Sequence, residues 1–163
     1  FRRETAIWAH LIHDNIVTLY GTTEGFGPTT ALVSQWFPEG TLLRLITEQG
    51  AALTIKSKLK LLHGIASGLY YLHSFPIVHG DITSSNVLVD LKDGEYRAYL
   101  TDFGLSNVLC GCLKDYPIEG SSVRPGAIRW TAPELLRSHD PPSDIKPTTQ
   151  NDMYSYGRVM FHV

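Results

Sequence analysis

The sequence predicts a fold of the α+β class, with helices and antiparallel strands in separate parts of the chain. One observation is a helical pattern of apolar residues that begins at Thr54 and lasts about five turns. Another is a pair of strand-like segments, 86–89 and 97–101, that flank the hairpin signal Asp93-Gly94. Both elements fit one ordinary globular core.

The composition agrees with a single soluble domain. The chain has 163 residues, of which 43% are hydrophobic. Its 14 Lys and Arg residues balance 16 Asp and Glu residues, so no strong field favours nucleic acid or a membrane surface. No apolar run approaches the roughly 20 residues of a membrane span, and the first residues lack a signal peptide's apolar core. Cys110 and Cys112 alone build neither a disulfide framework nor a zinc site, and we expect a protein of the cytoplasm or nucleus.

The first forty residues predict a helix followed by two strands. Helical spacing covers residues 4–11, and the polar residues 13–15 end the pattern. A strand is expected over 16–21. A second strand, rich in β-branched and aromatic residues, is expected over 29–37 and runs into a turn at 38–40.

The long central helix and the hairpin after it place two aspartates near each other. We expect a helix cap at Thr54. The apolar face of this helix is expected to consist of Leu59, Leu62, Ile65, Ala66, Leu69 and Leu72. A loop over 78–86 precedes the hairpin, and residues 102–104 follow it directly. Asp81 and Asp102 therefore leave opposite ends of the hairpin, and we expect them to converge on one cleft.

The last part of the chain contains a long irregular stretch. Residues from Asp102 to about Arg129 are rich in Gly, Ser and Pro, and a second Pro-rich stretch covers 139–147. A final helical segment is expected from Asp152. Long segments without secondary structure are usually functional or mobile, so we expect a regulatory or substrate-facing loop in the first stretch.

Four short motifs occur in an order that is typical of one enzyme family. They are "HGDITSSN" at 79–86, "DFG" at 102–104, "APE" at 132–134 and "DMYSYG" at 152–157. With a hairpin between the first two, they resemble the larger lobe of the protein kinase fold. The segment "GAIRWTAPELL" at 126–136 further resembles the tyrosine-kinase-like branch. The combination of "HGD" at 79–81 with "RPGAIRWTAPELL" at 124–136 resembles kinase-like proteins of mushroom-forming fungi.

The resemblance covers residues 1–163 but only part of a kinase domain. It implies a single truncated domain, with a remnant of the small lobe and the hinge at 1–37 and a partial, mainly helical large lobe at 38–163. Residues 1–17 match the small-lobe helix αC and the turn after it, and Glu4 matches the glutamate of that helix, which pairs with a lysine essential to catalysis. That lysine and the Gly-rich phosphate loop would lie upstream, and the match stops within helix αF. We therefore expect this segment alone to be marginally stable and inactive.

The resemblance also implies an activity. An intact domain of this kind transfers the γ-phosphoryl group of ATP to protein Ser, Thr or Tyr hydroxyls in signal transduction, using Mg²⁺. Asp81 would orient the substrate hydroxyl and accept its proton, while Asn86 and Asp102 would supply oxygen ligands to the metal. The residues alone leave open that Asp81 and Asn86 only cap a loop through side-chain to backbone bonds.

A nucleotide site is implied at the hinge. There the carbonyl of Gln35 and the amide of Phe37 would bond adenine, Ser34 would be a small gatekeeper, and Leu88 would lie beneath the ring. The alternative is a plain strand with a half-buried aromatic end. The residues that match the stacked column joining the two lobes of active kinases are Trp8, Leu19, His79, Phe103 and Asp152.

The catalytic loop departs from the family pattern. Protein kinases carry a lysine or arginine two or four residues after the catalytic aspartate, where this chain has Thr83 and Ser85. That cation stabilises the transferred phosphate, and its loss weakens transition-state binding. Arg124 and Arg129 are the nearest cations in sequence that could substitute. Gly80 replaces the arginine that normally pairs with a phosphate on the activation loop, so we expect loop phosphorylation not to be the main switch.

These departures keep two other functions open. One is a pseudokinase, a binding or scaffold module with the fold but without useful catalysis. The other is a small-molecule phosphotransferase, because the form "HGDxxxxN" also occurs in aminoglycoside and choline kinases. The later motifs belong to the protein kinase substrate platform and favour a protein substrate or binding partner.

Overall fold

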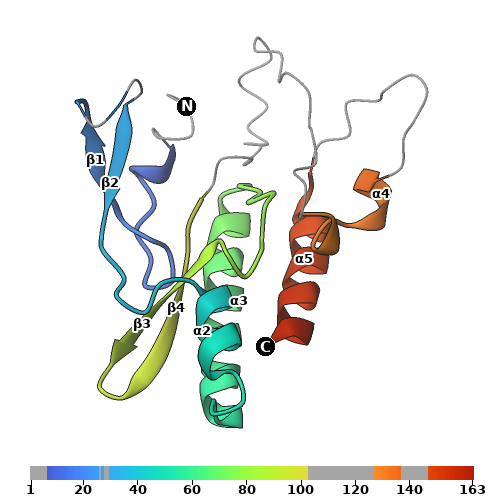
Figure 1. The fold of residues 1–163 in the computed structure, drawn as a ribbon. Coiled ribbons are helices and arrows are strands. Elements are labelled where there is room, and N and C mark those ends of the chain that lie inside the picture. Colours follow the sequence, from blue (N-terminus) through green and yellow to red (C-terminus); the bar gives the residue numbers. More distant parts are fainter. Residues whose placement is uncertain (1–6, 26, 28–29, 103–126, 137–146) are drawn as a thin grey trace.

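The structure, a computed structural model, describes residues 7–25, 27, 30–102, 127–136 and 147–163. Within this part of the chain, two hairpin sheets of two strands each lie on one side, and the longest helix lies between one hairpin and the last helix (Figure 1). This arrangement of helices with small antiparallel sheets confirms the predicted α+β class.

The predicted central hairpin is present. Strand β3 (Val87–Lys92) pairs antiparallel with β4 (Glu95–Leu100) in continuous register. Asp93 and Gly94 between them have φ angles of 53° and 73°. Two consecutive left-handed residues form the type I′ turn that matches the twist of a tight hairpin.

The first pair of strands is shorter than expected. Strand β1 (Leu19–Thr23) pairs antiparallel with β2 (Ala31–Ser34). Ile16 and Val17 do not belong to β1, because they pair with the end of β4 instead. Ile16 forms a parallel bridge with Leu100, and the Val17 N–H donates to the Leu100 carbonyl at 2.9 Å. The start of the chain is thereby attached to the central hairpin.

The helix expected over 4–11 is described only in its second half. Ile7 and Trp8 are helical and a turn follows them, whereas residues 1–6, including Glu4, lie outside the described residues. Trp8 is buried, and its indole N–H donates to the Val17 carbonyl.

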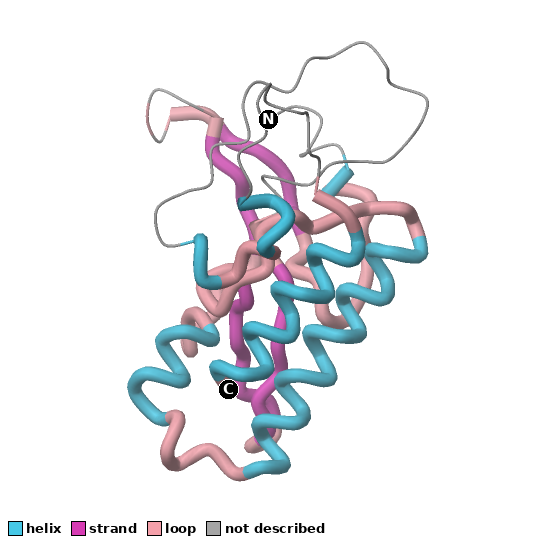
Figure 2. The backbone as a smooth tube through the Cα atoms, turned by 90° about the vertical axis from the view of Figure 1, so that its right-hand side faces the viewer, coloured by secondary structure: helices cyan, strands magenta, loops and turns pink. Residues whose placement is uncertain are grey.

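The long helix α3 (Ile55–Ser74) begins as predicted, with the Thr54 hydroxyl accepting the Ser57 N–H at 3.1 Å. Its predicted apolar face is partly wrong, because Leu59 is 60% exposed and Leu61 is buried. At about 100° per residue these two leucines lie on opposite sides of the helix, and packing against the hairpin selects the second. The buried large side chains are Leu61, Ile65, Leu69 and Leu72. Figure 2 shows the helix running beside the strands.

Two glycines let α3 approach its neighbours closely. A Cβ at Gly64 would lie 2.8 Å from the Asn15 amide nitrogen, and one at Gly68 would lie 2.9 Å from a methyl carbon of Leu100. The Asn15 amide also donates to the Ala98 carbonyl at 2.9 Å. Asn15 therefore joins the early part of the chain to both the helix and the hairpin.

The remaining helices lie before and after the long helix α3 in the sequence. Helix α2 (Leu42–Gln49), which we did not predict, begins at the cap Thr41 and buries Leu42 and Leu45. A short 3₁₀ turn η1 (Ala127–Arg129) and helix α4 (Pro133–Leu136) precede α5 (Thr149–His162).

Helix α5 begins three residues earlier than expected. The Thr148 and Asn151 side chains form a reciprocal capping box at its N-terminus. Among the helices of the described residues, none is both long and apolar enough to span a bilayer.

Candidate active site

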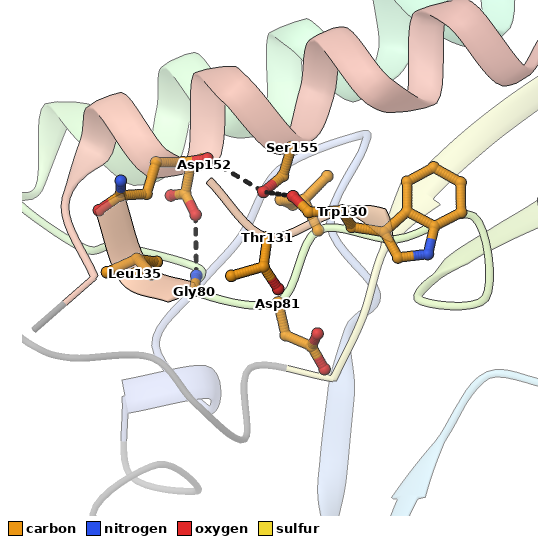
Figure 3. A pocket seen from close by; sticks show the side chains of 9 residues that line it. Gly80, Asp81, Trp130, Thr131, Leu135, Asp152 and Ser155 are labelled. Atoms are coloured by element: carbon orange, nitrogen blue, oxygen red, sulfur yellow. Dashed lines mark hydrogen bonds between the residues drawn. The ribbon is translucent and has the colours of Figure 1, made fainter. Parts of the chain in front are cut away.

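The loop that contains Asp81 is anchored by a buried carboxylate on α5. Asp152, which is 1% exposed, accepts the backbone N–H of His79 at 2.9 Å. It also accepts the backbone N–H of Gly80 at 2.8 Å (Figure 3). The His73 Nε2 atom lies 2.8 Å from the same carboxylate. A buried carboxylate is stable only when several donors satisfy it, and these donors come from α3 and from the loop. Gly80 has φ +77°, a conformation that suits glycine.

His79 connects the loop to the end of β4. The Asp81 N–H donates to its Nδ1 atom at 3.3 Å, so the proton is on Nε2, which lies 3.0 Å from the Thr101 carbonyl. Complete burial lowers the pKa of His79, against the opposing effects of Asp152, Asp81 and Asp102. A neutral ring with both nitrogens engaged in these contacts links two segments of the site.

Asp81 and Asn86 are in direct contact. The Asn86 amide nitrogen donates to the Asp81 carboxylate at 3.0 Å and to its carbonyl at 2.8 Å. The Asn86 backbone N–H donates to the hydroxyl of buried Thr83 at 3.2 Å. Within the described residues, no hydrogen bond occupies the Asn86 Oδ1 atom, so this oxygen is available as a ligand.

Asp102 and the loop that contains Asp81 flank the same open end of the hairpin, where Val87 pairs with Leu100, and not opposite ends as expected. Asp102 follows Thr101, whose N–H donates to the Asn86 carbonyl at 3.1 Å. Asp81 and Asp102 both raise the pKa of His79 against the effect of its burial, but only Asp81 lines the pocket described below, so the convergence of the two aspartates on one cleft stays a prediction. Asp102 is exposed and has φ +65°, which costs a non-glycine residue about 1–2 kcal/mol and is often found at functional sites.

A pocket opens beside Asp81. It is a small hollow of about 30 Å³ that opens to solvent, between loop residues 80–82, the segment from Trp130 to Leu135 and the first turns of α5. The Ser155 hydroxyl on α5 donates to the Trp130 carbonyl at 2.8 Å. Figure 3 shows the Asp81 carboxylate pointing away from α5. A hydroxyl group that approaches from the side facing away from α5 could reach the Asp81 carboxylate.

The predicted nucleotide-binding residues lie on two neighbouring segments. Ser34 and Gln35 are half-buried at the end of β2, and Phe37 is 4% exposed, so Phe37 offers only its backbone to a ligand. Leu88 on β3 is half-buried and forms a bridge with Thr41, just after the turn that follows Phe37. Leu88 therefore lies beside Thr41, four residues after the end of the expected hinge at Phe37.

The loop lacks a cation, as its sequence indicates. Thr83 is buried and Ser85 is exposed. Arg129 is exposed, and its carbonyl accepts the Arg158 Nε–H at 3.0 Å. Within the described residues, no Lys or Arg side chain forms an ion pair with Asp81 or Asp102. Arg124, Phe103 and Glu4 lie outside the described residues.

Sequence reasoning missed two residues that hold the site together. His73 supports Asp152 from 79 positions away, a contact without a local signal. Asn151 donates its amide to the Glu134 carboxylate and accepts the Thr148 N–H at 2.8 Å, so it joins α4 to the start of α5. The position of Asn151 three residues after Thr148 was the available signal, since it matches a capping box.

Comparison with known proteins defines the class to which this fold and site belong. Residues 1–163 match the family described as "Protein tyrosine and serine/threonine kinase", and the chain belongs to that family. Among curated relatives, it is 36% identical over 167 residues to the serine/threonine-protein kinase CTR1 of Arabidopsis thaliana. It is 33% identical to the ephrin type-A receptor 3 of Danio rerio and 32% identical to the serine/threonine-protein kinase TNNI3K of Mus musculus, each over 165 residues. The whole chain aligns in each case, but it spans only 15% to 18% of these relatives.

Proposed function

We propose that this chain forms part of an ATP- and Mg²⁺-dependent protein kinase domain that phosphorylates protein hydroxyls. The observation that carries the proposal is the hydrogen bond between Asn86 and Asp81 at 3.0 Å, beside the strand end that leads to Asp102. Family membership supports the reaction class. The anchoring of the loop by buried Asp152 supports a rigid catalytic site rather than a mobile surface loop.

In the proposed reaction, the substrate hydroxyl enters on the open side of Asp81. Its oxygen forms a bond with the γ-phosphorus, the bond from that phosphorus to the bridging oxygen of ADP breaks, and the hydroxyl proton passes to the Asp81 carboxylate. The Asn86 amide holds this carboxylate in one orientation. Orientation matters because phosphoryl transfer depends on positioning more than on covalent chemistry.

The donor set fits Mg²⁺. The Asn86 Oδ1 atom and the exposed Asp102 carboxylate are hard oxygen ligands, and Mg²⁺ commonly uses one or two such protein ligands together with water and substrate phosphates. When bound, the ion neutralises charge on the phosphates.

The nucleotide would bind along the segment after β2. The backbones of Gln35 and Phe37 would bond the adenine edge, with Ser34 behind it and Leu88 beneath it. Phe37 suits this role because its buried ring leaves only the backbone for contact. Glu4 would act indirectly, by holding a lysine of the small lobe.

A pseudokinase is the second candidate, favoured by one specific observation. The Thr83 side chain is buried and its hydroxyl accepts the Asn86 N–H, so this position serves the shape of the loop and not the charge of the phosphate. Without a cation there, the loop would bind a partner or nucleotide without useful turnover.

The test is Mg²⁺-dependent phosphate incorporation by the full-length protein. Wild type is compared with Asp81→Asn and Asp102→Asn, and with the control Asp93→Asn in the hairpin turn, where asparagine tolerates the left-handed backbone. A kinase loses incorporation in the first two variants and keeps it in the control. If the wild type binds nucleotide but incorporates no phosphate, the protein is a pseudokinase. If phosphate is transferred to a small molecule and not to protein, the protein is a small-molecule phosphotransferase.

A further inference from the structure

Ser84 joins the catalytic loop to two helices. It lies between Asp81 and Asn86 in sequence and is fully buried. Its carbonyl accepts the Leu43 N–H of α2 at 2.8 Å, and its hydroxyl lies 2.9 Å from the Nδ1 atom of His162 on α5. A buried hydroxyl requires a partner, and His162 supplies it. The backbone between the two site residues is therefore held from both sides.

His162 also contacts the wall of the pocket. Its ring packs edge-on against Trp130, with ring centroids 5.5 Å apart and planes at 69°. Trp130 lines the pocket beside Asp81, and α5 holds its carbonyl through Ser155 (Figure 3). One side chain thus contacts both the catalytic loop and the segment opposite it.

We propose that Ser84 and His162 are positioning residues for phosphoryl transfer, an inference that rests on the proposed function. Their hydrogen bond keeps the loop in the shape that holds Asn86 against Asp81. The ring of His162 keeps Trp130 in a fixed position relative to that loop. Neither side chain touches the reacting atoms. Their loss therefore lowers kcat with little change in the KM for ATP, since displaced catalytic groups cost about 10-fold to 100-fold in rate.

The experiment separates the two contacts of His162 in the full-length protein. The variant His162→Asn places an amide near the position of Nδ1 and keeps the hydrogen bond without the ring. The variant His162→Phe keeps the ring without the bond. Ser84→Ala and His162→Ala remove the bond from either end. His63→Ala and Ser74→Ala, both exposed on α3, are the matched controls. The readouts are kcat, the KM for ATP and hydrogen exchange of the amides of residues 82–86.

We expect Ser84→Ala and His162→Ala to lower kcat and to accelerate exchange in the loop, while exchange in α3 is unchanged. Compared with His162→Ala, His162→Asn recovers the part of kcat that depends on the hydrogen bond, His162→Phe recovers the part that depends on the contact with Trp130, and the controls match the wild type. An unchanged kcat in Ser84→Ala, or no recovery in a folded His162→Asn, overturns the inference and leaves the proposed function intact. A wild type that transfers no phosphate overturns the proposed function. In that case hydrogen exchange alone tests the positioning role. If the amides of residues 82–86 exchange at the wild-type rate in Ser84→Ala, the positioning role is refuted.

Discussion

The Asn86 amide nitrogen lies 3.0 Å from one carboxylate oxygen of Asp81 and 2.8 Å from the Asp81 carbonyl. This double contact closes the five-residue loop and directs the amide oxygen of Asn86 away from Asp81. One side chain therefore orients the proposed base and keeps an oxygen atom free for the proposed Mg²⁺ site.

Replacing Asn86 by Asp tests this relationship. The donor is lost and a second carboxylate faces Asp81, so we expect the free energy of unfolding at pH 7 to fall by about 1–3 kcal/mol. Acidification protonates one of the two carboxylates and relieves their repulsion, so the loss should shrink between pH 7 and pH 4. Urea unfolding at both pH values measures this. Asn86→Ala is the control, and its loss of stability should not depend on pH in the same way.

The buried His79 predicts a loss of stability in acid. Its pKa is lowered by burial, so below about pH 6.5 the unfolded chain binds a proton that the folded chain does not. The stability contributed by neutral His79 is complete above that pH and is lost as the pH falls toward the folded-state pKa. The slope can reach about 1.4 kcal/mol per pH unit. We expect His79→Phe to be less stable at pH 7 but to show a smaller slope between pH 7 and pH 5; equal slopes in the two proteins would contradict the assignment.

The glycines of α3 predict opposite effects for the same substitution. In Gly68→Ala the new Cβ would lie 2.9 Å from a Leu100 methyl carbon and 3.0 Å from the Asn15 carbonyl oxygen, so we expect a loss of about 1–3 kcal/mol. Gly157 in α5 has no atom within 4 Å of such a Cβ. There alanine should stabilise the protein by up to about 1 kcal/mol through its higher helix propensity. Chemical unfolding of both variants checks the signs. A neutral or stabilising Gly68→Ala would argue against close packing of α3, and a destabilising Gly157→Ala would argue against open space at α5.

The parts of the fold that could be predicted are those determined by neighbouring residues. The Asp93-Gly94 turn specifies the hairpin, and Thr54 with the apolar repeat behind it specifies α3. The buried face of α3 could not be predicted fully, because Leu59 and Leu61 are equally apolar and only contact with the hairpin distinguishes them.

The same distinction applies to the site. Asp81 and Asn86 lie five positions apart, and the motif alone predicts their proximity. The pair His73 and Asp152 is separated by 79 positions, and the pair Ser84 and His162 by 78. No periodicity or spacing connects such residues, since the packing of α5 against the loop and α3 brings them together.

The missing cation leads to a gain-of-function prediction. Ser85 is exposed and precedes Asn86, so Ser85→Arg adds a charge beside the loop with little structural cost, within about 0.5 kcal/mol. If the absent charge limits transfer, this variant should raise phosphate incorporation by about tenfold or more, because a positioned cation acts on the charge of the transition state. Ser85→Gln adds comparable length without charge and should have no effect. Thr83→Lys should be less useful, because the buried Thr83 hydroxyl that accepts the Asn86 N–H is lost. Equal rates in wild type, Ser85→Arg and Ser85→Gln would mean that another group already neutralises the phosphate, and the search should then turn to Arg129 and Arg124.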